Sequence, residues 1–234
     1  MSEQERSEAS EVSEARRARG SAEPGAAADF LAELARQRAT AILRTDSKAK
    51  AKAAMEAAVR GGFRHLEFTL TTPGALELVA EFAELPDLVV GAGTVLTVED
   101  ARAAVRAGAR FLVSPVMDEE VVRAAVDLGA VAIPGCHTPS EMLRAHRAGA
   151  ALQKLFPAPA GGPDYVRSVL APMPFLRILP TNGVTPDNAA QYLAAGAVAV
   201  GFVTSLFPAE DLAAGRFDRI EERARASLAA VRAP

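Results

Sequence analysis

Lys154 is the residue of this 234-residue chain whose type and surroundings point most directly to chemistry. It stands alone in the apolar stretch Leu152–Phe156. The other lysines crowd one polar segment, at Lys48, Lys50 and Lys52. Burying an ammonium group is costly unless it is paired or its pKa falls, and attack on a carbonyl carbon requires the neutral amine. We therefore predict that Lys154 is a nucleophile. The alternative is a structural lysine that pairs with a loop carboxylate or extends to solvent.

Glu67 is the second candidate for a chemical role. Apolar residues occupy every second position of the run His65–Leu70, so Glu67 lies on the opposite face of the predicted strand. A carboxylate that faces inward beside a lysine can hold the ammonium group, or can move protons once burial raises its pKa. The alternative is a purely structural ion pair with Lys154 or Arg44.

Two further side chains are suited to binding a substrate carboxylate. Arg44 ends the run Ala41–Arg44, and a guanidinium group binds a carboxylate through two parallel hydrogen bonds. A surface salt bridge is the alternative for Arg44. Thr94 ends the run Gly91–Thr94, where the glycines let a substrate approach the backbone and the threonine offers a hydroxyl group.

These residues lie in or directly after short apolar runs that alternate with helical stretches. Runs that are apolar at almost every position are typical of parallel strands buried on both faces. Right-handed βα units repeated in this way favour a (β/α)8 TIM barrel, with a doubly wound open sheet as the alternative. The predicted strands are Ala39–Arg44, His65–Leu70, Leu88–Val95, Phe111–Val116, Val131–His137, Leu152–Ala158, Arg177–Gly183 and Ala197–Val203.

The ends of the predicted helices carry their own signals. A glycine that supplies a left-handed helix stop precedes several strands, at Gly62, Gly108, Gly129, Gly149 and Gly196. A threonine that can cap a helix follows several strands, at Thr72, Thr97, Thr138 and Thr185. An extra helix from Phe30 to about Gln37 is expected to cover the bottom of the barrel.

Glycines near the last three predicted strands are candidates for binding phosphate, because barrels often bind phosphate through backbone amides at this point of the chain. Each of them taken alone more often marks a turn. They are Gly161, Gly162, Gly183 and Gly201. The three histidines are scattered along the sequence, and we predict no metal site and no cofactor.

Composition limits the class of protein. Half of the residues are hydrophobic and the net charge is −3, so no strongly basic field for nucleic acid or an anionic membrane is expected. The single cysteine and the lack of a long apolar run predict a cytoplasmic protein. Residues 1–28 contain few large apolar groups and are predicted to be a disordered or loosely helical tail, leaving residues 29–234 as one domain.

From about Ala39 to Phe207 the sequence resembles the 2-keto-3-deoxy-6-phosphogluconate / 4-hydroxy-2-oxoglutarate aldolases, a family of class I pyruvate aldolases. The segments that carry this resemblance are LEFTLTTPGA, GAGTVLT, FLVSPVMDEE, IPGCHTPSE, LQKLFPAP, LPTNGVTPDN and AVGFVTSLF. It implies that Lys154, followed by Phe156 in the K-[LF]-F-P motif, forms the Schiff base. It also implies that Glu67 is the general acid/base and that Thr94 contacts the carboxylate. Homotrimers are usual in such families, so the resemblance implies a homotrimer.

The sequence departs from the family pattern at three places. Many members carry arginine where this chain has Thr71, and Arg44 is expected to take over the carboxylate role. The usual PTGG is here Thr181-Asn182-Gly183 after a proline. The usual G-x-G-S is replaced by a segment that includes Gly201 and Thr204, in which Phe202 and Val203 add bulk. An unphosphorylated 2-keto-3-deoxy acid is therefore kept as an alternative substrate.

The activity implied is cleavage of a 2-keto-3-deoxy-6-phospho sugar acid or 4-hydroxy-2-oxoglutarate into pyruvate and an aldehyde. Lys154 would attack the keto carbon, Glu67 would shuttle protons, and no metal would be needed because the protonated imine accepts the electrons. Two rival interpretations remain. One is a phosphate-binding isomerase or epimerase, which would not need a buried lysine. The other is a barrel without catalysis that acts as a binding or assembly module.

Overall fold

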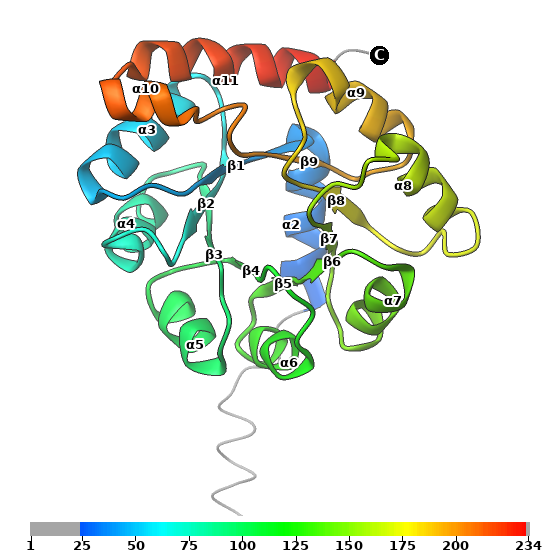
Figure 1. The fold of residues 1–234 in the computed structure, drawn as a ribbon. Coiled ribbons are helices and arrows are strands. Elements are labelled where there is room, and N and C mark those ends of the chain that lie inside the picture. Colours follow the sequence, from blue (N-terminus) through cyan, green and yellow to red (C-terminus); the bar gives the residue numbers. More distant parts are fainter. Residues whose placement is uncertain (1–23, 233–234) are drawn as a thin grey trace, which may run out of the picture.

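The computed structural model describes residues 24–232 and shows parallel strands arranged in a ring, with helices around the outside (Figure 1). The strands are β1 (Ala39–Leu43), β2 (His65–Thr69), β3 (Val89–Gly93), β4 (Phe111–Val113), β5 (Val131–Ile133), β6 (Gly135–Cys136), β7 (Gln153–Leu155), β8 (Ile178–Pro180) and β9 (Val200–Phe202). The helices are α2 (Pro24–Gln37), α3 (Lys48–Arg60), α4 (Ala75–Ala83), α5 (Val98–Arg106), α6 (Glu119–Asp127), α7 (Pro139–Arg147), α8 (Gly162–Leu170), α9 (Pro186–Ala194), α10 (Ala209–Ala214) and α11 (Phe217–Arg232). The predicted (β/α)8 barrel is confirmed.

The ring is built from two sheets with the orders β5-β4-β3-β2-β1-β9 and β6-β7-β8. A bridge between Thr181 and Gly201 joins the two sheets on one side. On the other side Pro134 divides the predicted strand Val131–His137 into β5, which pairs with β4, and β6, which pairs with β7. Proline cannot donate a backbone hydrogen bond to the ladder, so the strand is interrupted there.

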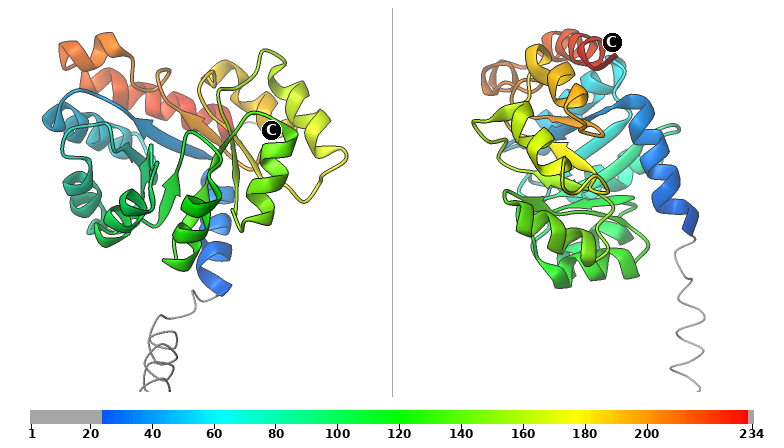
Figure 2. Two further views of the ribbon diagram at one scale, coloured as in Figure 1. Left: turned by 60° about the horizontal axis from the view of Figure 1, so that its bottom comes forward. Right: turned by 90° about the vertical axis from the view of Figure 1, so that its right-hand side faces the viewer.

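The hydrophobic core has two layers. The larger layer lies between strands and helices, whereas the smaller one fills the inside of the barrel and includes Val89, Phe111 and Leu179. Helix α2 lies across the barrel's bottom (Figure 2), and its buried side chains Phe30 and Leu34 join the inner layer. The N-terminal end of the barrel is thereby closed by apolar packing.

The predicted helix ends are mostly confirmed. The five glycines that precede strands all have positive φ, between 78° and 111°. Thr97 and Thr138 form capping boxes at the starts of α5 and α7, and Thr185 is the N-cap residue of α9. The predicted cap at Thr72 is wrong. Helix α4 begins after Gly74, whereas the Thr72 hydroxyl is buried and accepts a hydrogen bond from the Thr45 amide.

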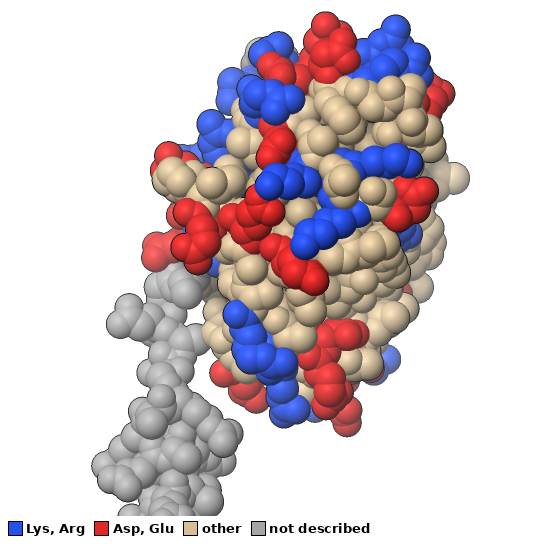
Figure 3. Space-filling view, turned by 90° about the vertical axis from the view of Figure 1, so that its left-hand side faces the viewer, with Lys and Arg blue, Asp and Glu red and all other residues tan. Residues whose placement is uncertain are grey.

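Helix α2 begins at Pro24, earlier than the predicted start at Phe30 and inside the predicted tail. The rest of that tail, residues 1–23, lies outside the described residues. None of the helices in the described part of the chain is long and apolar enough to cross a membrane. Positive and negative side chains are interspersed on the face shown in Figure 3. Ion pairs join neighbouring helices, as between Lys52 of α3 and Glu81 of α4.

Candidate active site

A cavity of about 260 Å³ opens at the carboxyl ends of the strands, the face on which TIM barrels carry their active sites. Both residues with the strongest chemical signals in the sequence, Lys154 and Glu67, border this cavity. Its lining consists of Ile42, Arg44, Glu67, Thr69, Thr94, Pro115, Lys154, Phe156, Thr181, Asn182, Val203, Thr204 and Phe207.

Lys154 lies at the centre of β7 and is only 7% exposed. Its backbone amide donates to the carbonyl oxygen of Pro134 at 3.0 Å, which fixes the strand next to the break between β5 and β6. The ion pairs formed by residues 24–232 do not include Lys154, and its Nζ lies 4.9 Å from the centroid of the Phe156 ring. Burial lowers the pKa of the Lys154 amine, and the nearby charge of Arg44 lowers it further. The neutral, nucleophilic form is therefore favoured.

Glu67 lies at the centre of β2 and is 2% exposed. Burial raises the pKa of its carboxyl group, against the opposing effect of the positive charges of Lys154 and Arg44. The negative charge of Glu67 in turn raises the pKa of Lys154, against the larger effect of burial. The pair thus consists of an amine that readily loses its proton and a carboxyl group that readily holds one.

Arg44 and Thr94 lie together at the rim of the cavity. Arg44 follows β1, its side chain is exposed, and its Nη2 donates to the Thr94 hydroxyl at 3.2 Å. Thr94 follows β3 with φ of 60°, an uncommon conformation for a β-branched residue. Such local strain is often found at functional sites. The guanidinium group and the hydroxyl group together offer several donors to an anionic group entering from solvent.

The expectation that the glycines of Gly91–Thr94 admit a substrate to the backbone is wrong. Protein side chains already fill the space beside both glycines. A Cβ at Gly91 would lie 2.5 Å from two ring atoms of Phe111, and a Cβ at Gly93 would overlap the carboxylate of Glu67.

Part of the cavity lining is apolar. Phe156, Val203 and Phe207 form an apolar wall, and Thr181 and Thr204 add hydroxyl groups to the lining. The sequence had singled out Phe156, Thr181 and Thr204 as binding residues and Val203 as added bulk, whereas Phe207 was missed because an apolar side chain gives no chemical signal. Ile42 was also missed, although the strand alternation that places Arg44 at the mouth places Ile42 on the inner face of β1.

Several residues predicted to bind substrate lie outside the cavity lining. Thr71 is exposed, and its hydroxyl lies 3.1 Å from that of Thr69. Gly161 and Gly162 are at the start of α8, and Gly183 follows β8 with φ of 106°. Gly201 faces the protein, because a Cβ there would lie 2.8 Å from Ile42 and 2.9 Å from the Thr181 hydroxyl.

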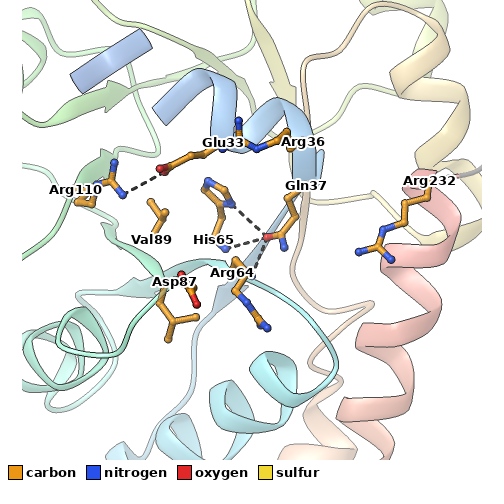
Figure 4. Close-up of a pocket in the computed structure, with 10 residues that line it drawn as sticks. Glu33, Arg36, Gln37, Arg64, His65, Asp87, Val89, Arg110 and Arg232 are labelled. Atoms are coloured by element: carbon orange, nitrogen blue, oxygen red, sulfur yellow. Dashed lines mark hydrogen bonds and ion pairs between the residues drawn. The ribbon is translucent and has the colours of Figure 1, made fainter. Parts of the chain in front are cut away.

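A second cavity, of about 560 Å³, lies at the opposite end of the barrel beside α2 (Figure 4). Its arginines have structural explanations. Arg36 and Arg232 belong to the last turns of α2 and α11, where positive charge favours the helix dipole. Arg64 donates to two backbone carbonyls, and Arg110 pairs with Glu33 at 3.2 Å. Although this cavity is larger, it lacks the amine and carboxyl pair of the mouth.

Comparisons with known proteins agree with the geometry of the mouth. Residues 31–223 match the family model described as KDPG and KHG aldolase. The KHG/KDPG aldolase of Escherichia coli (strain K12) is 38% identical over 175 residues, which cover 74% of this chain and 82% of that protein. The 2-dehydro-3-deoxy-6-phosphogalactonate aldolase of the same organism is 35% identical over 172 residues, which cover 72% of this chain and 84% of that protein.

A solved structure gives the same result for the fold. The crystal structure of KDPG aldolase from Legionella pneumophila, described as holding pyruvate captured at low pH as a covalent carbinolamine intermediate, superimposes with a TM-score of 0.77 at 30% identity. The match covers 84% of this chain and 97% of that one. The chain therefore belongs to the KDPG and KHG aldolase family, a family of lyases.

Proposed function

We propose that this protein is a class I aldolase in which Lys154 forms a Schiff base with the keto group of its substrate. The observation that carries the proposal is a buried amine with a lowered pKa, bordering the same cavity as a buried carboxyl group with a raised pKa. Burial explains both shifts, and their opposite directions match the needs of a nucleophile and of an acid/base group.

The reaction proceeds through a small number of balanced steps. The neutral amine of Lys154 attacks the C2 carbonyl of a 4-hydroxy-2-oxo acid, and the carbinolamine takes a proton from the carboxyl group of Glu67 and loses water to give an iminium ion. Glu67, now a carboxylate, accepts the proton of the C4 hydroxyl group as the C3–C4 bond breaks, and the electron pair of that bond forms an enamine. The aldehyde leaves, Glu67 returns a proton to C3, and water then hydrolyses the iminium to pyruvate, the free amine and a proton that Glu67 takes up.

Arg44 and Thr94 bind the carboxylate of the keto acid in this proposal. Their contact at the rim places donors on one side of Lys154, and a guanidinium group matches the planar geometry of a carboxylate. The aldehyde half of the substrate then contacts Thr181, Thr204 and the apolar wall to which Phe156 belongs.

The substrates we propose are those for which the relatives are named, a 2-keto-3-deoxy-6-phospho sugar acid and 4-hydroxy-2-oxoglutarate, which yield glyceraldehyde 3-phosphate and glyoxylate. The apolar wall at Val203 keeps an unphosphorylated 2-keto-3-deoxy acid as a second candidate. A panel of all three substrates with the purified enzyme distinguishes them by kcat/KM.

We further propose that the enzyme is a cytoplasmic homotrimer without a metal or cofactor. A solved structure similar to this chain is described as a cage designed from symmetric oligomeric domains, which supports self-association. The single cysteine, Cys136, is buried, which suits a reducing compartment. Light scattering of the purified protein tests the trimer, because a monomer or dimer mass would contradict it.

The decisive experiment traps the Schiff base. Borohydride reduction in the presence of pyruvate, followed by peptide mass spectrometry, should place a reduced adduct on Lys154. The variant Lys154→Arg should give no adduct and no retro-aldol activity, whereas the control variant Lys50→Arg in α3 should retain both. An adduct on another lysine, or none in the unmodified enzyme, contradicts the proposal and favours an isomerase or a non-catalytic barrel.

A further inference from the structure

Gly91 and Gly93 on β3 are glycines for a reason other than backbone conformation. Neither has a positive φ, so an alanine could adopt the same backbone geometry. They lie two and four residues after Val89, which belongs to the inner layer of the core, and so they face the inside of the barrel on the same side of the strand. Glycine weakens a strand interior and often marks a place where another group approaches closely.

At Gly91 the approaching group is part of the hydrophobic core. A Cβ at this position would lie 2.5 Å from Cδ2 and Cε2 of Phe111 and 2.6 Å from its Cγ. Phe111 packs inside the barrel against Phe30 of α2, with ring centroids 5.4 Å apart. Gly91 therefore makes room for a packed aromatic ring.

At Gly93 the approaching group is the side chain of Glu67. A Cβ here would overlap Oε1 of Glu67 and lie 2.7 Å from its Cδ and 3.0 Å from its Cγ. In the ladder between β2 and β3, Glu67 is opposite Gly91, and Thr69 is opposite Gly93. The carboxyl group of Glu67 thus extends along the strand direction, over Gly93 and toward the mouth where Lys154 lies.

We infer that Gly93 is a positioning residue for the aldolase reaction, because its missing Cβ creates the space in which the carboxyl group of Glu67 is held beside the substrate cavity. This inference rests on the proposed acid/base role of Glu67. The carboxyl group of Glu67 occupies the space that an added methyl group at Gly93 would fill, so this methyl group displaces it from its place near Lys154. Small displacements of a group that transfers protons strongly reduce its contribution.

The test is a rescue experiment. Gly93→Ala should lower kcat by about 100-fold, the lower range of what general acid/base catalysis contributes. Glu67→Asp shortens the side chain by one methylene group and withdraws the carboxyl group from the space that the new methyl group needs. The double variant should therefore have a kcat about tenfold above that of Gly93→Ala alone, although Glu67→Asp by itself slows the enzyme.

Gly91→Ala is the matched control on the same strand. Its methyl group meets the Phe111 ring, so it should lower the melting temperature, and its effect should combine with that of Glu67→Asp without rescue. If Gly93→Ala does not fold, the double variant still decides the question, because the inference expects it to fold and to cleave substrate. A double variant that is equally unfolded overturns the inference.

Two further outcomes separate this inference from the proposed function. A Gly93→Ala enzyme with unchanged kcat and an unchanged pH profile overturns the positioning role alone, provided that Glu67→Gln is strongly impaired. If Glu67→Gln itself keeps full activity, the proposed acid/base role fails and the positioning role fails with it.

Discussion

Strand β2 carries a buried titratable side chain toward each end of the barrel, and the two have different surroundings. At the bottom, burial and the charges of Arg110 and Arg36 lower the pKa of His65 to about 4. Nearer the mouth, burial raises the pKa of Glu67. His65 is held by Gln37 and packs against Phe30, whereas Glu67 shares a cavity with Lys154.

The comparison shows that a shifted pKa alone does not identify a reaction site. Burial shifts the pKa of both side chains in the direction that favours their neutral forms, and the cavity at the bottom is the larger of the two. Of these two cavities, the one at the mouth is bordered by an acid and a base with opposite shifts. What supports catalysis at the mouth is that two opposite pKa shifts occur beside one cavity. The size of a single pKa shift and the volume of the cavity are weaker indications.

The largest effect on activity is expected from a variant that breaks this pairing. Glu67→Gln keeps the shape of the side chain but cannot transfer a proton, so kcat for retro-aldol cleavage should fall about 100-fold or more. The negative charge of Glu67 raises the pKa of Lys154, so its removal should lower that pKa further. The acid limb of pyruvate trapping by borohydride, which reports protonation of the amine, should therefore move to lower pH.

The isosteric design of Glu67→Gln supplies its own control. Its thermal unfolding should match that of the unmodified enzyme, so a loss of activity cannot be assigned to unfolding. An acid limb that stays in place or moves to higher pH contradicts the electrostatic coupling of Glu67 and Lys154.

A smaller effect is expected at the bottom of the barrel, on stability alone. The folded protein holds the pKa of His65 near 4, and the unfolded chain binds this proton near pH 6.5. The unfolded state is therefore favoured as the pH falls from 6.5 to about 4, by up to about 3 kcal/mol. His65→Asn, which keeps a donor for Gln37, should flatten urea-unfolding free energies across this range while leaving kcat unchanged.

The matched control for this variant is His146→Asn, because His146 lies half-buried at the surface against the exposed ring of Phe175. Its urea-unfolding curves give the reference for the same type of substitution at a position outside the barrel. If His65→Asn lowers kcat instead, the two ends of β2 are coupled, and the separation between a structural and a chemical end is wrong.

The smallest effect is expected at the mouth, on the binding of the substrate by Arg44. Arg44→Lys keeps the positive charge but removes the planar pair of donors, so KM for the keto acid should rise about tenfold with little change in kcat. Steady-state kinetics of cleavage measures both constants. An equal fall in kcat would show that Arg44 acts in the bond-breaking step, against the role in binding that we propose.

The sequence predicted well those features that depend on local pattern. Apolar runs separated by glycine stops were sufficient for the barrel, because each strand is buried on both faces and each stop requires a positive φ. Lys154 could be found because burying a lone lysine in an apolar run is costly, so its presence there indicates a special role. The interruption at Pro134 was missed, since the apolar run continues across it.

Features that depend on neighbours distant in the sequence were not predictable from pattern. The space beside Gly93 could be assigned to a substrate or to a side chain equally well until β2 and β3 were placed in register. The space beside Gly201 was likewise open to either assignment, and in the structure Ile42 and Thr181 occupy it. Gln37, which accepts hydrogen bonds from the amides of Arg64 and His65, carried no signal because a glutamine near a helix end is unremarkable.

The closure of the barrel's bottom by Phe30 and Leu34 has a kinetic consequence. Apolar packing lies below the cavity that Lys154 borders, so both products depart through the mouth at which the substrate arrived. Because the three-carbon fragment stays covalently attached until the last hydrolysis, the aldehyde must exit first. Product release is therefore ordered, and in the reverse direction the enzyme must be loaded with pyruvate before an aldehyde can react productively.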